Sequence, residues 1–240
     1  MNILKKTHSK NNNEIVLIEA GGIAIPPYCK KEVQQSSSGI PVRQQKTVLI
    51  IGVVHGDEPQ GEFLIENYLD TPHPSPLPQG AREKNNNRLL FIPCLNPDGL
   101  KNKTRQNANM VDINRNFPTN NWELTEMNEY YGGASSASEI ETEFVIETIE
   151  EYSPAAILTF HAPYKVVNYD GPAEEIAKEV SVIINYPVQH DIGYPTPGSF
   201  GTYAGVERNI PIITLELDEN LEVSEFIEPI GKIFDYLASY

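Results

Sequence analysis

Four short, continuous apolar runs most constrain how this chain folds. They cover residues 47–54, 88–94, 155–160 and 210–217 and consist largely of Val, Ile and Leu. A strand that is apolar at nearly every position must be buried on both faces, as in a parallel sheet covered by helices. Segments with apolar residues at helical spacing alternate with these runs. The pattern predicts an α/β fold: a single domain over residues 1–240, with a mixed, largely parallel twisted sheet and helices on both faces.

Composition and charge exclude several classes of protein. The chain has 240 residues and a net charge of −15, from 18 Lys and Arg against 33 Asp and Glu. Such a charge repels nucleic-acid phosphates and anionic lipid, so we expect neither as a partner. No stretch approaches the roughly 20 apolar residues that span a bilayer, and the N-terminus lacks the apolar region of a signal peptide. These features predict a cytoplasmic protein, with a homodimer as one option for its oligomeric state.

One segment does not fit the alternation of strands and helices. Residues 71–87 contain prolines at positions 72, 74, 76 and 78 and an Asn triplet at 85–87. Alternating prolines can join neither a helix nor a sheet. We therefore expect an exposed insert that takes no part in any chemistry.

Side chains that can bind a metal stand where three of the apolar runs end. His55 follows the first run with Glu58 three residues later, His161 follows another, and Glu216 lies near the end of the last. Open α/β sheets form their sites at the carboxyl ends of the strands. Two imidazoles and one carboxylate make a three-ligand zinc site that leaves a fourth position for water. The His-x-x-Glu spacing alone is weak evidence, because short motifs match by chance and surface pairs share it.

Three further charged residues need an explanation. Glu216 lies at the end of a strand too apolar to bury a carboxylate without a partner, so it is either paired with a cation or working in a site. A water on zinc favours the second reading, because a neighbouring carboxylate can take its proton. Arg105 and Arg115 lie in the polar stretch 100–136 and are candidates for gripping an anion in a bidentate way. Either arginine could instead tie this stretch to a backbone carbonyl or an acid.

These motifs together resemble a known family. They are His55-x-x-Glu58, Asn96-Pro97-Asp98-Gly99, Asp112-x-Asn114-Arg115-Asn116-Phe117, His161 and Thr214-Leu215-Glu216-Leu217. In this order they resemble the zinc carboxypeptidases typified by pancreatic carboxypeptidase A. Within that family, the residues in and around the motifs are most similar to those of the bacterial murein tripeptide amidases. The resemblance runs from about residue 47 to 217. It implies a carboxypeptidase-like fold. The residue types at positions 96–99, taken by themselves, predict a turn.

The resemblance also implies a metal and a catalytic apparatus. One Zn²⁺ per chain would be held by His55, Glu58 and His161. Glu216 would be the base that activates the zinc-bound water and later protonates the leaving amine. Arg105 would stabilise the oxyanion of the tetrahedral intermediate.

The implied substrate is a small anionic peptide. Asn114 and Arg115 would bind its free carboxylate, and Tyr194 would close over it, a purely structural tyrosine being the alternative. The substrate would be murein tripeptide, cleaved between γ-D-glutamate and meso-diaminopimelate during cell-wall recycling. The chain departs from the amidase pattern after His161, where Ala162 stands in place of an acid.

Three other functions remain open at this point. The first is a zinc deacylase of the aspartoacylase and succinylglutamate desuccinylase type, which shares several motifs, although the Asn-Pro-Asp-Gly turn and the Thr-Pro-Gly-Ser-Phe-Gly loop favour a peptidase. The second is a general carboxypeptidase. The third is an inactive module that binds cell-wall peptides, which we would expect to have lost a ligand or the base.

Overall fold

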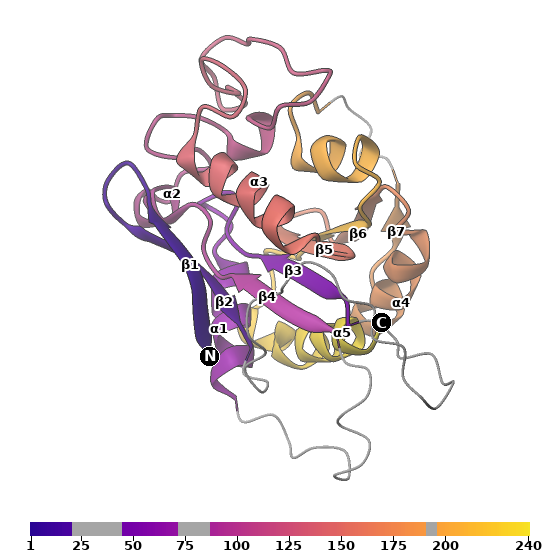
Figure 1. Ribbon diagram of the computed structural model, residues 1–240. Helices are drawn as coiled ribbons and strands as arrows, with labels where there is room; N and C mark the ends of the chain where they lie inside the picture. Colours follow the sequence, from indigo (N-terminus) through magenta and orange to yellow (C-terminus); the bar gives the residue numbers. More distant parts are fainter. Residues whose placement is uncertain (21–44, 72–86, 191–195) are drawn as a thin grey trace, which may run out of the picture.

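One mixed sheet forms the centre of the computed structural model, which describes residues 1–20, 45–71, 87–190 and 196–240. The sheet has eight strands in the order β1-β2-β4-β3-β5-β8-β6-β7 (Figure 1). The strands are β1 (Asn2–His8), β2 (Glu14–Glu19), β3 (Thr47–Ile51), β4 (Arg88–Ile92), β5 (Ala156–His161), β6 (Val166–Asp170), β7 (Val188–Gln189) and β8 (Ile212–Glu216). The α-helices are α1 (Gln60–Asp70), α2 (Pro97–Asn102), α3 (Ile140–Tyr152), α4 (Glu174–Ile184) and α5 (Ile227–Ser239). Short helical turns are η1 (Ile113–Arg115), η2 (Gly201–Val206) and η3 (Val223–Phe226).

The four apolar runs form the four adjacent strands β4, β3, β5 and β8, which pair in parallel. Along β3, Val48 and Ile50 belong to the core on one face of the sheet. Leu49 and Ile51, the alternate residues, belong to the core on the other face. This confirms the expectation that the runs are strands buried on both faces. It also places the carboxyl ends of these strands at one edge of the sheet.

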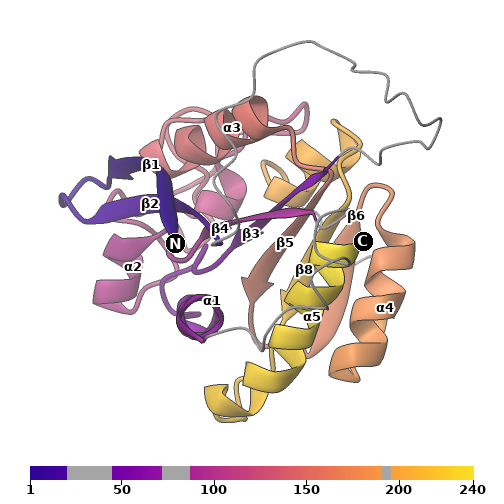
Figure 2. The same cartoon turned by 60° about the horizontal axis from the view of Figure 1, so that its bottom comes forward.

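Helices cover both faces, as expected. One core lies between the sheet and helices α1, α4 and α5, and it contains Leu64, Ile176 and Phe234. Figure 2 shows α4 and α5 lying side by side on this face. The opposite core contains Phe144 of α3 and Leu17 of β2, and α3 lies across that face in Figure 1.

The outer strands add antiparallel pairs that the apolar pattern did not indicate. β1 and β2 form an antiparallel hairpin, β2 pairs antiparallel with β4, and β6 pairs antiparallel with β8. These strands are short or partly exposed and carry polar residues, so none of them reads as a continuous apolar run. The sheet is therefore mixed, with a parallel centre.

Two local expectations have different outcomes. The turn expected at residues 96–99 is wrong: Asn96 is the N-cap of α2, and its side chain accepts the Gly99 N–H at 2.9 Å. An asparagine cap followed by proline at the first helical position is a common way to begin a helix. The prediction of an exposed insert concerns residues 71–87, of which 72–86 lie outside the described residues. Within the described part of the chain, no helix has the length and apolar character needed to cross a membrane.

Candidate active site

A tight backbone turn presents His55 and Glu58. After β3 the chain passes Gly52, where a Cβ would lie 2.2 Å from the Pro93 carbonyl oxygen, so only glycine fits this approach. Val53 then adopts φ 47°, a left-handed conformation that is strained for a β-branched residue. Such strain persists where the surrounding structure enforces it and is frequent at functional sites. The turn closes when the Glu58 N–H donates to the His55 carbonyl at 3.2 Å, which brings both side chains to one point.

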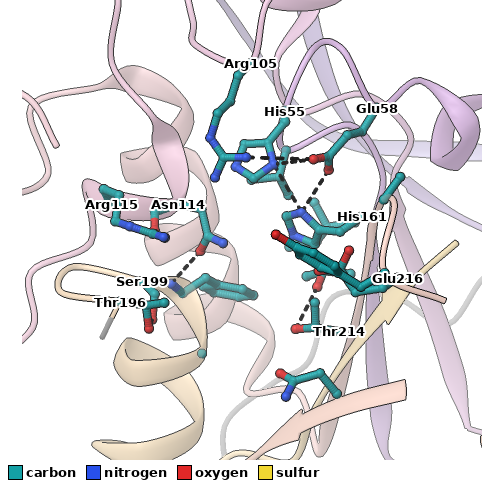
Figure 3. A pocket seen from close by; sticks show the side chains of 18 of the residues that line it. His55, Glu58, Arg105, Asn114, Arg115, His161, Thr196, Ser199, Thr214 and Glu216 are labelled. Atoms are coloured by element: carbon teal, nitrogen blue, oxygen red, sulfur yellow. Dashed lines mark hydrogen bonds and ion pairs between the residues drawn. The ribbon is translucent and has the colours of Figure 1, made fainter. Parts of the chain in front are cut away.

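Three potential metal ligands converge at the carboxyl edge of the sheet (Figure 3). Glu58 Oε1 lies 3.0 Å from His55 Nδ1, and Glu58 Oε2 lies 3.0 Å from His161 Nδ1. The two Nδ1 atoms are 3.2 Å apart. One ligand atom from each of the three residues lies within 4.8 Å of the others, so the cluster could hold a metal ion. The structure thus brings together the set expected from the spacing of the motifs.

Asp112 fixes the orientation of His55, a role that the sequence did not reveal. Its Oδ1 atom lies 3.1 Å from His55 Nε2, and its Oδ2 atom accepts from Arg105 Nε at 2.9 Å. The Asp112 side chain is fully buried. Burial opposes its ionisation, but His55 and the nearby arginines hold the pKa of its carboxyl well below the usual range. Asp112 is therefore a buried anion that can accept the Nε2–H of His55.

The donor set fits zinc. When His55 gives its Nε2–H to Asp112, its Nδ1 atom keeps a lone pair that is directed at the cluster. Burial by itself would lower the pKa of His55, but the carboxylates of Asp112 and Glu58 outweigh it and raise that pKa to about 9. A carboxylate behind a ligating histidine is the usual support for a zinc ligand. Two histidines and one glutamate are also the protein ligands of a catalytic zinc site with an open position.

Glu216 lies beside this cluster and has no cationic partner in the described part of the chain. In the parallel register of β5 and β8, Glu216 stands opposite His161. The residue is 8% exposed, and its buried Oε2 atom has no hydrogen-bond partner among the described residues. Burial raises the pKa of this carboxyl above its ordinary value. The arrangement does not support a structural ion pair, the alternative left open by the sequence.

The two arginines and Asn114 lie near the cluster and are held by neighbouring groups. Arg105 pairs with Asp112 at 2.9 Å and has Glu58 Oε1 at 3.8 Å. The alternative expectation for Arg105, that it ties the polar stretch to an acid, is therefore met in part, because its guanidinium contacts Asp112. Arg115 donates from Nη1 to the Asn114 carbonyl at 2.7 Å, and the Asn114 side-chain oxygen accepts the Phe200 N–H at 2.9 Å.

One cavity of about 340 Å³ joins the candidate residues. Tyr194 lies outside the described residues, so its expected position is not tested. All other residues expected from the sequence to form the site line this cavity: His55, Glu58, Arg105, Asn114, Arg115, His161 and Glu216.

Comparison with known proteins identifies relatives of this chain. A sequence model of the family "Zinc carboxypeptidase" matches residues 33–181. Murein peptide amidase A of Escherichia coli strain K12 is 30% identical over 188 residues, which cover 73% of each chain. Murein peptide amidase A of Vibrio campbellii is 39% identical over 141 residues, 52% of this chain and 55% of the relative.

Solved structures show the same fold. The crystal structure of murein-tripeptide amidase from Escherichia coli O157 has a TM-score of 0.73 at 24% identity, over 97% of this chain and 90% of that one. Carboxypeptidase A from Helicoverpa armigera has a TM-score of 0.68 at 17% identity, over 99% of this chain and 69% of that one. The likeness confirms the expected carboxypeptidase-like fold. With the family match over most of the chain, it shows that this protein belongs to the zinc carboxypeptidase family and is a zinc metallopeptidase.

Proposed function

We propose that the protein hydrolyses the amide bond between γ-D-glutamate and meso-diaminopimelate in murein tripeptide, as part of cell-wall recycling in the cytoplasm. One observation carries the proposal. A His-Glu-His cluster, two arginines and the Glu216 carboxylate, whose Oε2 atom has no partner among the described residues, line one cavity, in a chain whose relatives are named murein peptide amidases. This combination of residues in one cavity supports a role in hydrolysing an amide bond of an anionic peptide.

We assign one zinc ion per chain to His55, Glu58 and His161. The ion, when bound, supplies a Lewis acid and lowers the pKa of a coordinated water. Glu216 then takes the proton of the attacking water at its Oε2 atom, which no described group occupies, and returns that proton to the leaving amine. The raised pKa of Glu216 suits this shuttle, because a stronger base accepts the proton more readily.

Arg105 and Arg115 interact with two different negatively charged groups of the substrate. Arg105 stabilises the oxyanion that develops on the scissile carbonyl, because it approaches Glu58 and is held in place by Asp112. Arg115 and Asn114 bind the free carboxylate at the end of the peptide. The Asn114 carbonyl anchors one guanidinium nitrogen of Arg115, so its remaining N–H groups are oriented in advance. Tyr194 closes over the bound peptide.

A three-substrate assay tests the proposal. Purified protein is offered murein tripeptide, an ordinary dipeptide blocked at its N-terminus, and an N-acyl amino acid, with products identified by mass spectrometry. We expect turnover of the tripeptide with release of diaminopimelate, loss of turnover after chelation, and recovery on addition of zinc. Turnover of the N-acyl amino acid alone would instead identify a deacylase, and preference for the ordinary peptide a general carboxypeptidase.

A further inference from the structure

Tyr130 lies beside both of the arginines that line the cavity. The centre of its ring is 5.3 Å from the Arg105 Cζ atom and 5.8 Å from the Arg115 Cζ atom. Both distances are within the roughly 6 Å over which a guanidinium is attracted to the negative face of an aromatic ring. Figure 3 shows the two arginines on the side of the cavity away from Glu216. One tyrosine therefore interacts with two cationic groups of the site.

The segment that carries Tyr130 is tied to the chain neighbours of both arginines. The side chain of Gln106, which follows the first arginine, donates to the Asn128 carbonyl at 2.6 Å. The N–H of Asp112, which precedes the second arginine, donates to the Tyr131 carbonyl at 2.8 Å. The Tyr130 N–H donates to the side-chain oxygen of Asn128 at 2.8 Å. These contacts fix the backbone around Tyr130 relative to both arginines.

The ring restricts movements that hydrogen bonds at one edge of a guanidinium leave possible. Arg105 donates from Nε to Asp112 at 2.9 Å, and Arg115 donates from Nη1 to the Asn114 carbonyl at 2.7 Å. A planar group held at one edge can still tilt about that edge. A ring below the guanidinium opposes the tilt, because moving away from the ring loses the attraction. The N–H groups that remain for the substrate are then oriented before it binds.

The position of Tyr130 suits such a role. It is 46% exposed and lines the cavity together with both arginines, so it is not a core residue whose loss would disturb the fold. Its hydroxyl makes no hydrogen bond within the described part of the chain. The ring therefore carries the interaction, and phenylalanine should be able to replace it. Arg115 is only 7% exposed, and a cation–π contact is stronger where water is excluded.

We propose that Tyr130 is a positioning residue that orients both Arg105 and Arg115 through the face of its ring. The inference rests on the proposed function and deepens it, because that function gives the oxyanion to Arg105 and the terminal carboxylate to Arg115. Tyr130 forms and breaks no bond in the reaction. It keeps the two anion-binding groups in a fixed relation, which favours a substrate whose scissile carbonyl and terminal carboxylate have the matching separation.

The first test compares murein tripeptide with a form whose main-chain terminal carboxylate is amidated. Tyr130→Leu removes the ring and keeps an apolar side chain. We expect it to retain the zinc content of wild type, to lower kcat on both peptides about fivefold through Arg105, and to lower the preference for the free carboxylate about fivefold through Arg115. Tyr130→Phe keeps the ring, so both quantities should stay within about twofold of wild type. A smaller fraction of folded protein would lower kcat but leave the preference unchanged.

Tyr152→Leu is the matched control. Tyr152 also has an arginine over its ring, with the Arg88 Cζ atom 5.1 Å from the ring centre, but neither residue lines the cavity. The control removes the same kind of contact elsewhere, so we expect kcat and the preference to change less than twofold. An unchanged preference in Tyr130→Leu, equal losses in Tyr130→Phe, or losses of the same size in the control would overturn the inference.

Nuclear magnetic resonance keeps the inference independent of the proposed reaction. Protons over the face of an aromatic ring resonate at higher field, so the side-chain N–H signals of Arg105 and Arg115 report the contact. They are recorded on protein with isotope-labelled arginine and assigned with Arg105→Lys and Arg115→Lys. We expect both signals to move in Tyr130→Leu and to stay in place in Tyr130→Phe.

The two measurements separate the inference from the function on which it rests. If the wild type cleaves no γ-D-glutamyl peptide but both signals move only in Tyr130→Leu, the proposed function fails and the positioning of the two arginines stands. If either signal is unmoved in Tyr130→Leu, Tyr130 does not orient that arginine and the inference is wrong.

Discussion

Replacing Asp112 tests how much the metal centre depends on a residue that touches no metal. Asp112 accepts from His55, Arg105 and the Asn114 N–H, at 3.1, 2.9 and 2.9 Å. In Asp112→Asn one of the two oxygens becomes an NH₂ group, so either the His55 or the Arg105 contact is lost and the remaining one is made to a neutral acceptor. Loss of such support typically lowers metal affinity 10- to 100-fold, about 1.4 to 2.7 kcal/mol. We expect the lower figure for Asp112→Asn and the upper one for Asp112→Ala.

The assay is a zinc titration against a fluorescent competing chelator. It is run at pH 9, because the proton on His55, whose pKa is raised to about 9, competes with zinc at lower pH. Asp98→Asn is the matched control: Asp98 is equally buried, at 1% exposure, but it accepts from Ser9 and Asn11 and contacts none of the three ligands. We expect this control to bind zinc within twofold of wild type. If both Asp112 variants also bind zinc as tightly as wild type, Asp112 does not support the site.

Three other predictions address the site and the core. Glu216→Gln should retain one zinc per chain by metal analysis and lose at least 100-fold in kcat, because the amide cannot take a proton; an active variant would remove Glu216 from its assigned role. Arg115→Ala should impair substrates with a free terminal carboxylate far more than their amidated forms, and equal losses in kcat/KM would contradict the assignment. Burial raises the pKa of Glu141 to about 7 from 4.5, so its contribution to stability is complete below pH 4.5 and is lost as the pH rises to about 7. Urea unfolding of Glu141→Gln should therefore show a gain of roughly 3 kcal/mol at pH 8 and none at pH 4, whereas a constant difference would show that Glu141 does not titrate in this range.

The central strands and the metal ligands could be predicted because both leave local signals. A strand buried on two faces is apolar at successive residues, and His55, His161 and Glu216 each stand at the end of such a run. The carboxyl ends of parallel strands meet at one edge of the sheet. Residues that stand at the ends of such strands in the sequence are therefore expected to lie near one another. The outer strands leave no such signal, because partly exposed antiparallel strands alternate polar with apolar residues over short lengths.

The sequence by itself determined the class of fold, the parallel centre of the sheet, the His-Glu-His set and the nearby carboxylate. Only the tertiary structure decided which groups support and extend that set. Asp112 could be seen within a motif, but its contact with His55 spans 57 residues of chain and required the folded loop. Tyr130 carries no motif at all: its ring meets two arginines because the segment around it is held by Gln106 and by the backbone of Asp112. Contacts between segments far apart in the chain are set by tertiary packing, and no local pattern of residues records them.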